Sequence, residues 1–269
     1  MQQVWLGSLL STAIVSIISI TGIFFLSMKT AKLQKIVFVL VSFAVGALLG
    51  NVFFHLLPES FEVIENKTLI AVLVMSGILI FFVMEKFLHW HHGHNIGEFQ
   101  HHHHPKSFGY ISLFADGMHN FTDGILIAAG WMASPEIGIA TTLAVVLHEI
   151  PQEISDFGIL IHAGFTAKKA LWLNFYAALA AILGNVVTLL IGSSVESLSI
   201  WVLPIAAGGF IYLAGTDLMP ELNKDRSRRN SAIQLVMIIA GLLLMYFVMG
   251  DHSHAGHAHD HIHHHGHTH

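Results

Sequence analysis

The chain of 269 residues is 54% hydrophobic and only 11% charged. This composition is too apolar for a soluble domain and predicts an all-α, polytopic membrane protein in contact with lipid. The formal net charge of -5 lacks the basic excess of a nucleic-acid-binding protein, so no nucleic-acid partner is expected. Because the chain has no cysteine, a transition metal would have to be bound by histidine, carboxylate, amide or water.

Runs of about 20 apolar residues are long enough to cross a bilayer, and eight of them follow one another along the chain. The first run begins after Met1-Gln2-Gln3, which carry no positive side chain, so we interpret it as a retained helix rather than a signal peptide. The predicted spans are 4–27, 36–57, 68–90, 108–132, 137–162, 169–192, 200–220 and 231–250.

The basic residues are concentrated in every second connection between the predicted spans. Eleven of the twelve lie in connections that follow odd-numbered spans, and only Lys67 lies in an opposite connection. The positive-inside rule therefore places the basic connections in the cytoplasm and both chain termini outside it. The expected location is a cell membrane, either a plasma membrane or a bacterial inner membrane.

Two segments of the chain are rich in histidine. One is the third connection, residues 89–107, and the other is the C-terminal tail, residues 251–269. Neither segment has enough apolar residues to build a core, so we expect disordered segments that bind metal weakly and exchangeably. Residues 1–250 form the predicted eight-helix membrane domain.

The fourth and fifth spans carry side chains that can bind metal at helical spacing. His119 and Asp123 lie four residues apart, with Asn120 beside them and Asp116 one turn earlier, so one face of a helix can present all four. An ionisable side chain inside a membrane is costly and indicates a functional site by default. These spans are therefore the candidate site.

The fifth span presents two parallel columns. His148, Gln152 and Asp156 repeat every four residues, and Glu149 and Glu153 lie alongside. Facing columns on two helices can surround two neighbouring ions, with a shared carboxylate. The first predicted ion is bound by His119, Asp123, His148 and Gln152, and the second by Asn120, Asp123 and Glu149. Mixed nitrogen and oxygen ligands suit zinc, iron, manganese or cadmium.

Other polar residues in the spans have weaker assignments. Isolated groups such as His162 and Asn185 are expected to form hydrogen bonds between helices. Pro151 lacks an N–H group and is expected to loosen the helix beside the ligands. Residues assigned to a possible path for the ion are Asn51, His55, Asp116, Glu153 and Asp156.

Several motifs together resemble the ZIP (Zrt- and Irt-like) family of divalent metal transporters. They are HLLPE at the end of the second span, HNFTDG on the fourth, HEIPQE followed by Asp156 on the fifth, and DLMPE on the seventh. The resemblance implies a transporter domain of eight helices and inward transport of a divalent metal, zinc first. It also implies a nearly binuclear metal centre, an elevator-like motion and a homodimer. The metal is then the cargo, and no cofactor is expected.

Two positions depart from the resembled pattern, and two other functions compete with it. Gln152 stands where histidine or glutamate is common, and Asn51 stands where the second helix often has aspartate. The first alternative is an intramembrane zinc metallohydrolase, because His148-Glu149 begins a string like HExxH. The second histidine of that motif is replaced by Gln152. The other alternative is a cation-diffusion exporter, which usually has six spans.

Overall fold

The computed structural model describes residues 2–21, 30–96, 105–192, 198–223 and 227–249. These residues form helices joined by short connections, with no strand among them. The helices are α1 (Gln2–Ile18), η1 (Ser19–Thr21), α3 (Thr30–Asn51), η2 (Val52–Leu56), α4 (Leu57–Val63), α5 (Lys67–Ile96), α6 (Pro105–Ala133), α7 (Pro135–His162), α8 (Ala167–Ala178), α9 (Ala180–Gly192), α10 (Leu198–Leu213), η3 (Ala214–Leu218), α11 (Met219–Leu222) and α12 (Arg228–Met249).

The helical architecture confirms the predicted class of an all-α membrane protein. Within the described residues, five segments are long and apolar enough to cross a bilayer: Lys32–Val63, Lys67–Lys86, Ala167–Gly192, Ile200–Leu222 and Arg228–Val248. Helix α1 is apolar but shorter, with 17 residues. Helices α6 and α7 are long, and their acidic side chains make them less apolar. The predicted crossing of the membrane by α1, α6 and α7 stays a prediction.

Two helix boundaries differ from the sequence-based prediction. Helix α5 continues to Ile96, so the first part of the 89–107 connection is helical rather than disordered. The sixth span is divided into α8 and α9 at Leu179. His101–His104 and the tail 251–269 lie outside the described residues.

The second and seventh spans each contain a π-helical turn that ends two residues before a proline. Leu57 donates its N–H to the carbonyl of Val52 before Pro58, and Met219 donates to that of Ala214 before Pro220. Proline cannot donate to the carbonyl four residues earlier, so the hydrogen-bond ladder widens there. By contrast, α7 continues through Pro151 without a break.

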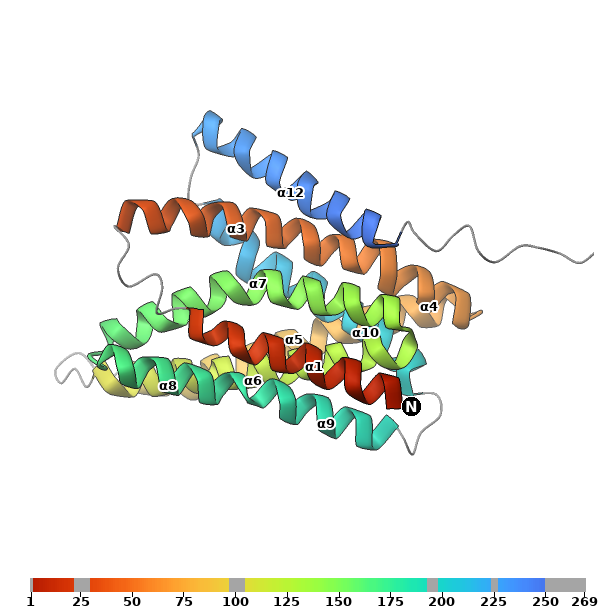
Figure 1. The fold of residues 1–269 in the computed structure, drawn as a ribbon, viewed down its shortest axis with the longest axis horizontal. Coiled ribbons are helices and arrows are strands. Elements are labelled where there is room, and N and C mark those ends of the chain that lie inside the picture. Colours follow the sequence, from red (N-terminus) through yellow and green to blue (C-terminus); the bar gives the residue numbers. More distant parts are fainter. Residues whose placement is uncertain (1, 22–29, 97–104, 193–197, 224–226, 250–269) are drawn as a thin grey trace, which may run out of the picture.

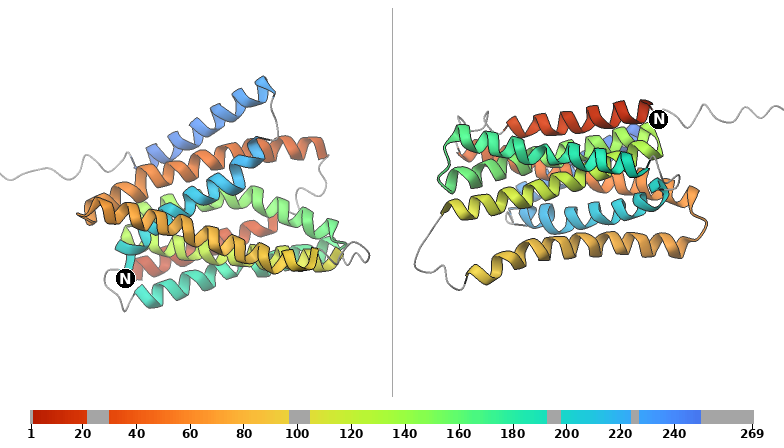
Figure 2. Two further views of the ribbon diagram at one scale, coloured as in Figure 1. Left: turned by 180° about the vertical axis from the view of Figure 1, so that it is seen from behind. Right: turned by 90° about the horizontal axis from the view of Figure 1, so that it is seen from below.

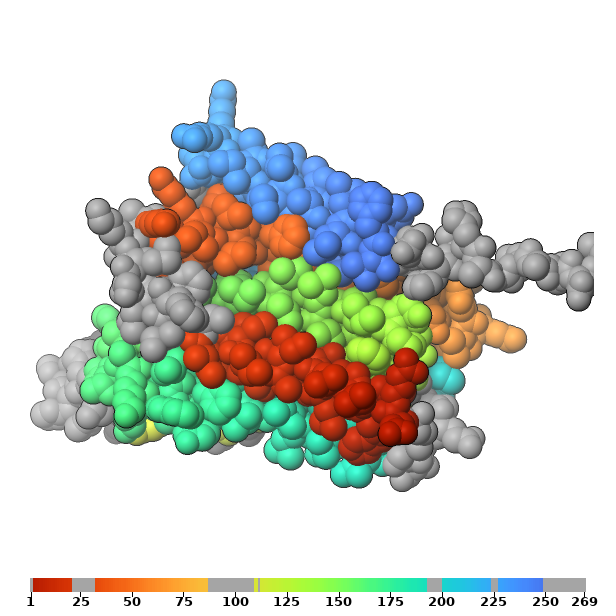
Figure 3. All heavy atoms as spheres, viewed as in Figure 1, coloured from red at the N-terminus to blue at the C-terminus, as the bar shows by residue number. Residues whose placement is uncertain are grey.

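The helices pack as two groups (Figures 1 and 2). Helices α1, α6, α7, α8 and α9 contact one another, whereas α3 pairs with α12 and α5 pairs with α10. The groups meet where α3 packs on α7 and α10 packs on α6. Figure 3 shows α7 lying between α3 on one side and α1 on the other. Buried side chains such as Leu48, Ile127, Val145 and Phe210 join the two groups into one core.

Asn185 confirms the expectation of a hydrogen bond between helices. Its Nδ2 group donates to the Ser8 carbonyl at 3.1 Å and to Ser8 Oγ at 2.5 Å, and thereby joins α9 to α1. His162 lies exposed at the end of α7, and no hydrogen bond of its side chain is seen among the described residues. The expectation for His162 is therefore not met within this part of the chain.

Replacing Gly184 with leucine is expected to disrupt the membrane domain. Helices α6 and α9 touch closely here, because a Cβ atom at Gly184 would lie 2.0 Å from the carbonyl oxygen of Phe121. Overpacking that shifts the backbone typically costs about 1–3 kcal/mol, and occasionally more. Gly158→Leu is the matched control, since nothing lies within 4 Å of a Cβ there. Size-exclusion profiles and Tm values should separate the two variants. Equal stability would contradict this packing.

Candidate metal centre

A tight connection sets the register between α6 and α7. Ser134 alone separates the two helices, its side chain accepts a hydrogen bond from the Ile137 N–H at 3.2 Å, and Pro135 occupies the first turn. His119 precedes Ser134 by fifteen residues and His148 follows it by fourteen. At the rise of an α-helix, both lie about 22 Å from the turn. The two ligand columns therefore meet at one level.

Four side chains converge at this level: His119 and Asp123 from α6, and His148 and Glu149 from α7. Their ligand atoms all lie within 4.8 Å of one another. The two Nε2 atoms of His119 and His148 are 3.3 Å apart. His148 Nε2 is 3.2 Å from Asp123 Oδ2 and 3.7 Å from Glu149 Oε1. His119 Nε2 is 3.8 Å and 3.5 Å from the same two oxygens.

Five of the six separations among these ligand atoms are close to the edges of a small tetrahedral coordination site. An ion that binds four nitrogen or oxygen atoms at about 2.0–2.1 Å keeps them about 3.3–3.4 Å apart. The measured distances of 3.2–3.8 Å bracket that value. Two carboxylates with two neutral imidazoles also balance the charge of one divalent cation. The donor set favours zinc or a similar metal, and without thiolates it is unsuited to copper(I).

A backbone hydrogen bond orients one of the four ligands, whereas carboxylate oxygens of two others have no hydrogen-bond donor among the described residues. His148 Nδ1 donates to the Ala144 carbonyl at 3.0 Å, which leaves the lone pair of Nε2 directed at the centre. Asp123 Oδ2 and both Glu149 carboxylate oxygens are buried, and no hydrogen-bond donor reaches them among the described residues. A buried carboxylate without a donor is costly, and a cation bound among these oxygens would offset that cost.

The grouping differs from the predicted pair of ion sites. Glu149, assigned to the second ion, stands with the ligands of the first. Gln152 is half-buried, and its side chain makes no hydrogen bond to another described residue, so its part in metal binding stays a prediction. Asn120 is fully buried and donates to Asp116 Oδ1 at 2.9 Å, while its own Oδ1 has no partner. That oxygen remains available to a second ion.

Three acidic residues of the predicted path continue from the centre toward the helix ends next to the basic connections. Asp116 is buried beside Asn120, and Asp156 accepts a hydrogen bond from Ser112 at 3.4 Å. Glu153 is fully buried and accepts one from Asn174 at 2.6 Å. Asn174 of α8 was not among the residues predicted from the sequence. Its isolated amide within an apolar span was the available signal.

The two remaining path residues lie on α3 and η2, away from α6. Asn51 is buried and donates to Thr141 of α7 at 3.3 Å. His55 is 4% exposed, and neither of its ring nitrogens has a hydrogen-bond partner among the described residues. Thr141 lies two turns from His148, on the side opposite the acidic residues. The structure therefore places these residues at the other end of the centre.

The fold and this group of side chains define a polytopic helical membrane protein with a buried cluster of histidine and carboxylate side chains that could hold a metal ion. The family model described as "ZIP Zinc transporter" matches residues 2–109 and 100–249. The match covers nearly the whole described chain, so the protein belongs to the ZIP family. This confirms the resemblance seen in the sequence motifs.

Individual relatives agree with the family match. The chain is 36% identical to zinc transporter ZIP13 of Pongo abelii, over 77% of this chain and 65% of that protein. It is 32% identical to the human zinc transporter ZIP13, over 77% of this chain and 69% of that protein. The Drosophila melanogaster ZIP13 homolog is 32% identical over 90% of this chain and 88% of its own length. The chain thus spans about two thirds of the mammalian relatives it matches. These relatives are transporters, which favours transport over the metallohydrolase and exporter alternatives.

Proposed function

We propose that this protein transports a divalent transition metal, zinc first, across a membrane through the centre formed by His119, Asp123, His148 and Glu149. The observation that carries the proposal is the convergence of their ligand atoms at tetrahedral distances within the helical bundle. The ion is cargo and has to leave again. A site with two carboxylates and two imidazoles balances its charge without the strong thiolate bonds of a structural zinc site.

The proposed direction is toward the basic connections, which the positive-inside rule assigns to the cytoplasm. Unpartnered carboxylate oxygens of Asp116 and Glu153 extend from the centre on that side and can exchange ligands with a departing ion. Asn51 and His55 would serve the entry side. This orientation places both chain termini outside the cytoplasm, in a plasma or bacterial inner membrane.

The proposed motion is a shift of α1 and α6–α9 against the remaining helices. The metal centre lies within the first group, because all four ligands are on α6 and α7. The seam that would move is the contact of α3 with α7 and of α10 with α6. A homodimer is part of the proposal, since the second group would need a fixed support in the membrane.

The test is metal uptake into proteoliposomes that contain the purified chain. We expect saturable zinc uptake above that of empty liposomes, and competition by cadmium, manganese and iron measured side by side. Zinc uptake equal to that of empty liposomes would contradict transport. If zinc moved only from the cytoplasmic side of the inserted protein to its external side, the result would favour the cation-diffusion exporter.

Replacing Gln152 with histidine is expected to strengthen zinc binding. Position 152 lies one turn after His148, and a neutral imidazole is a better zinc ligand than an amide oxygen. Because a transporter must also release its ion, we expect a lower apparent KM with an unchanged or lower maximal rate. Uptake is normalised to inserted protein. Unchanged zinc affinity in Gln152→His, beside a loss in His148→Ala, would show that position 152 does not face the metal.

The histidine-rich connection is proposed as an accessory metal trap or sensor. Replacing the histidines between 89 and 104 by glycine and serine should leave zinc uptake measurable, because imidazoles outside the predicted spans are expected to bind metal exchangeably. The measurement is initial uptake rate per inserted chain. Complete loss of uptake from a correctly inserted variant would assign these histidines to the transport path itself.

A further inference from the structure

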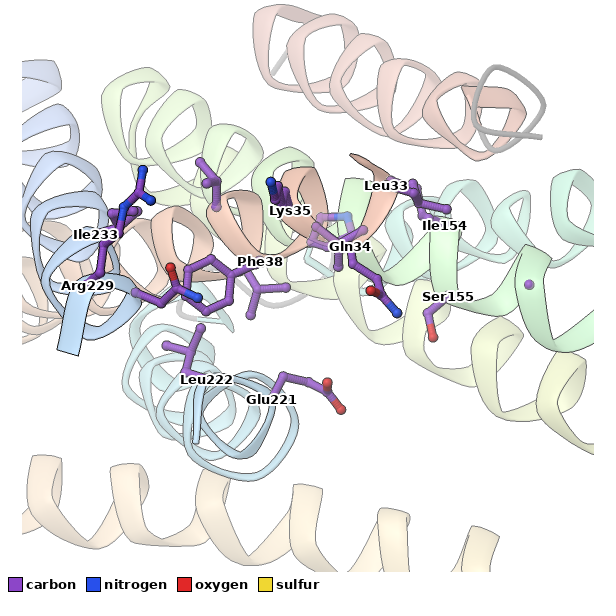
Figure 4. Close-up of a pocket in the computed structure, with 16 residues that line it drawn as sticks. Leu33, Gln34, Lys35, Phe38, Ile154, Ser155, Glu221, Leu222, Arg229 and Ile233 are labelled. Atoms are coloured by element: carbon purple, nitrogen blue, oxygen red, sulfur yellow. The ribbon is translucent and has the colours of Figure 1, made fainter. Parts of the chain in front are cut away.

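A cavity of about 1090 Å³ opens between α3, α7, α11 and α12. Figure 4 shows the residues that line it, among them Lys35 and Phe38 of α3 and Arg229 of α12. It lies at the end of the bundle that carries the basic connections. None of the four residues of the metal centre lines it.

The cavity uses a face of α7 that the metal centre does not use. Its lining on α7 consists of Pro151, Ile154, Ser155 and Gly158. At 3.6 residues per turn, this face points away from the one that carries Glu149 and Glu153. The cavity is therefore separate from the acidic column assigned to the path of the ion.

The lining changes from polar to apolar with depth. Lys35 lies near the start of α3 and Arg229 is the second residue of α12, so both stand at the mouth. Val41 lies six residues beyond Lys35, about 9 Å deeper along the helix. Pro151 forms the deep end on α7. A ligand that fills this space needs a polar end and an apolar end.

The charge at the mouth favours an anion. Lys35 and Arg229 project from two different helices, whereas Glu221 is the one carboxylate among the lining residues. In Figure 4 the Glu221 side chain extends away from Arg229. Lys32 and Arg228, both exposed, add positive charge at the same helix ends. Basic pockets between membrane helices on the cytoplasmic side suit phospholipid headgroups.

We propose that this cavity binds one anionic phospholipid, with its phosphate between Lys35 and Arg229 and an acyl chain along Phe38, Val41 and Ile154. Such a lipid would touch both α3 and α7, which belong to the two different groups of helices. The choice of leaflet follows the proposed orientation of the chain. The site itself does not depend on metal transport, so its test is a binding measurement without metal.

Native mass spectrometry of the purified full-length chain in detergent tests the charged half of the site. Phosphatidylglycerol, phosphatidylcholine and inorganic phosphate are added separately. We expect one tightly bound phosphatidylglycerol per chain and about thirty-fold weaker binding in Lys35→Gln/Arg229→Gln, from about 1 kcal/mol per basic group. The matched control is Lys67→Gln/Lys168→Gln, which removes two exposed charges that do not line the cavity. It should bind the lipid like wild type.

Gly158→Phe tests the apolar half without changing any charge. A Cβ at Gly158 meets nothing within 4 Å, so a large side chain can enter the cavity while the helix is kept. We expect this variant to lose the bound lipid at unchanged Tm. Retained binding in both cavity variants would overturn the proposal. Equal binding of phosphatidylcholine would exclude recognition of the anionic headgroup. Equal affinity for inorganic phosphate would identify a free-anion site instead.

Discussion

Replacing His119 and Asp123 together with alanine is expected to reduce zinc uptake to the level of empty liposomes. The change removes one imidazole and one carboxylate, so two of the four converging ligands remain and one negative charge faces a divalent ion. Water does not compensate the excess positive charge of an ion in this buried centre. The measurement is initial uptake of radioactive zinc per inserted chain.

The control for this variant also removes one histidine and one carboxylate, but from outside the centre. His162→Ala/Glu65→Ala replaces an exposed histidine at the end of α7 and an exposed glutamate between α4 and α5. It should transport zinc like wild type. If the His119 and Asp123 variant also transported zinc like wild type, the centre would not be the transport site.

Glu149→Ala is expected to weaken zinc binding far more than Gln152→Ala. Glu149 Oε1 lies 3.5 Å and 3.7 Å from the two imidazole nitrogens of the centre, and it has no hydrogen-bond donor among the described residues. Its loss should cost at least about 100-fold in affinity, since even outer-shell changes cost 10- to 100-fold. Gln152→Ala leaves all four ligands in place.

Isothermal titration calorimetry with zinc, carried out on each purified variant, compares the contributions of positions 149 and 152 to zinc affinity directly. Matching Tm values without metal show that both variants are folded. An equal loss of zinc affinity in Gln152→Ala would support the ligand set predicted from helical spacing, in which Gln152 binds the first ion. An unchanged affinity in Glu149→Ala would remove Glu149 from the centre.

The sequence predicted the helical class and the level of the site because both depend on local patterns. Apolar runs and alternating basic connections indicate spans, and His119, Asp123 and His148 stand out as costly residues within them. All three belong to the group of four side chains that converge in the structure, and their binding of metal stays a prediction. The same costly side chains lower the hydropathy of α6 and α7, so the feature that marks the site also weakens the signal for a membrane span.

Other features depend on packing that spacing along one helix does not encode. Helical periodicity puts Gln152 on the His148 column and Glu149 on its neighbour, but the crossing of α6 and α7 brings Glu149 to His119. Predicting the hydrogen bond from Asn174 to Glu153 would have required knowing that α8 packs on α7. The π-helical turns before Pro58 and Pro220 keep the apolar pattern of a helix, so they are not visible in it.

X-ray absorption at the zinc edge tests the central claim most directly, because it reports the atoms around a bound ion. For the purified chain loaded with one zinc ion, we expect a four-coordinate shell of nitrogen and oxygen at about 2.0–2.1 Å. Scattering from two imidazole rings should accompany it, from His119 and His148. A six-coordinate shell, or scattering from fewer than two imidazoles, would contradict a centre built from these four side chains.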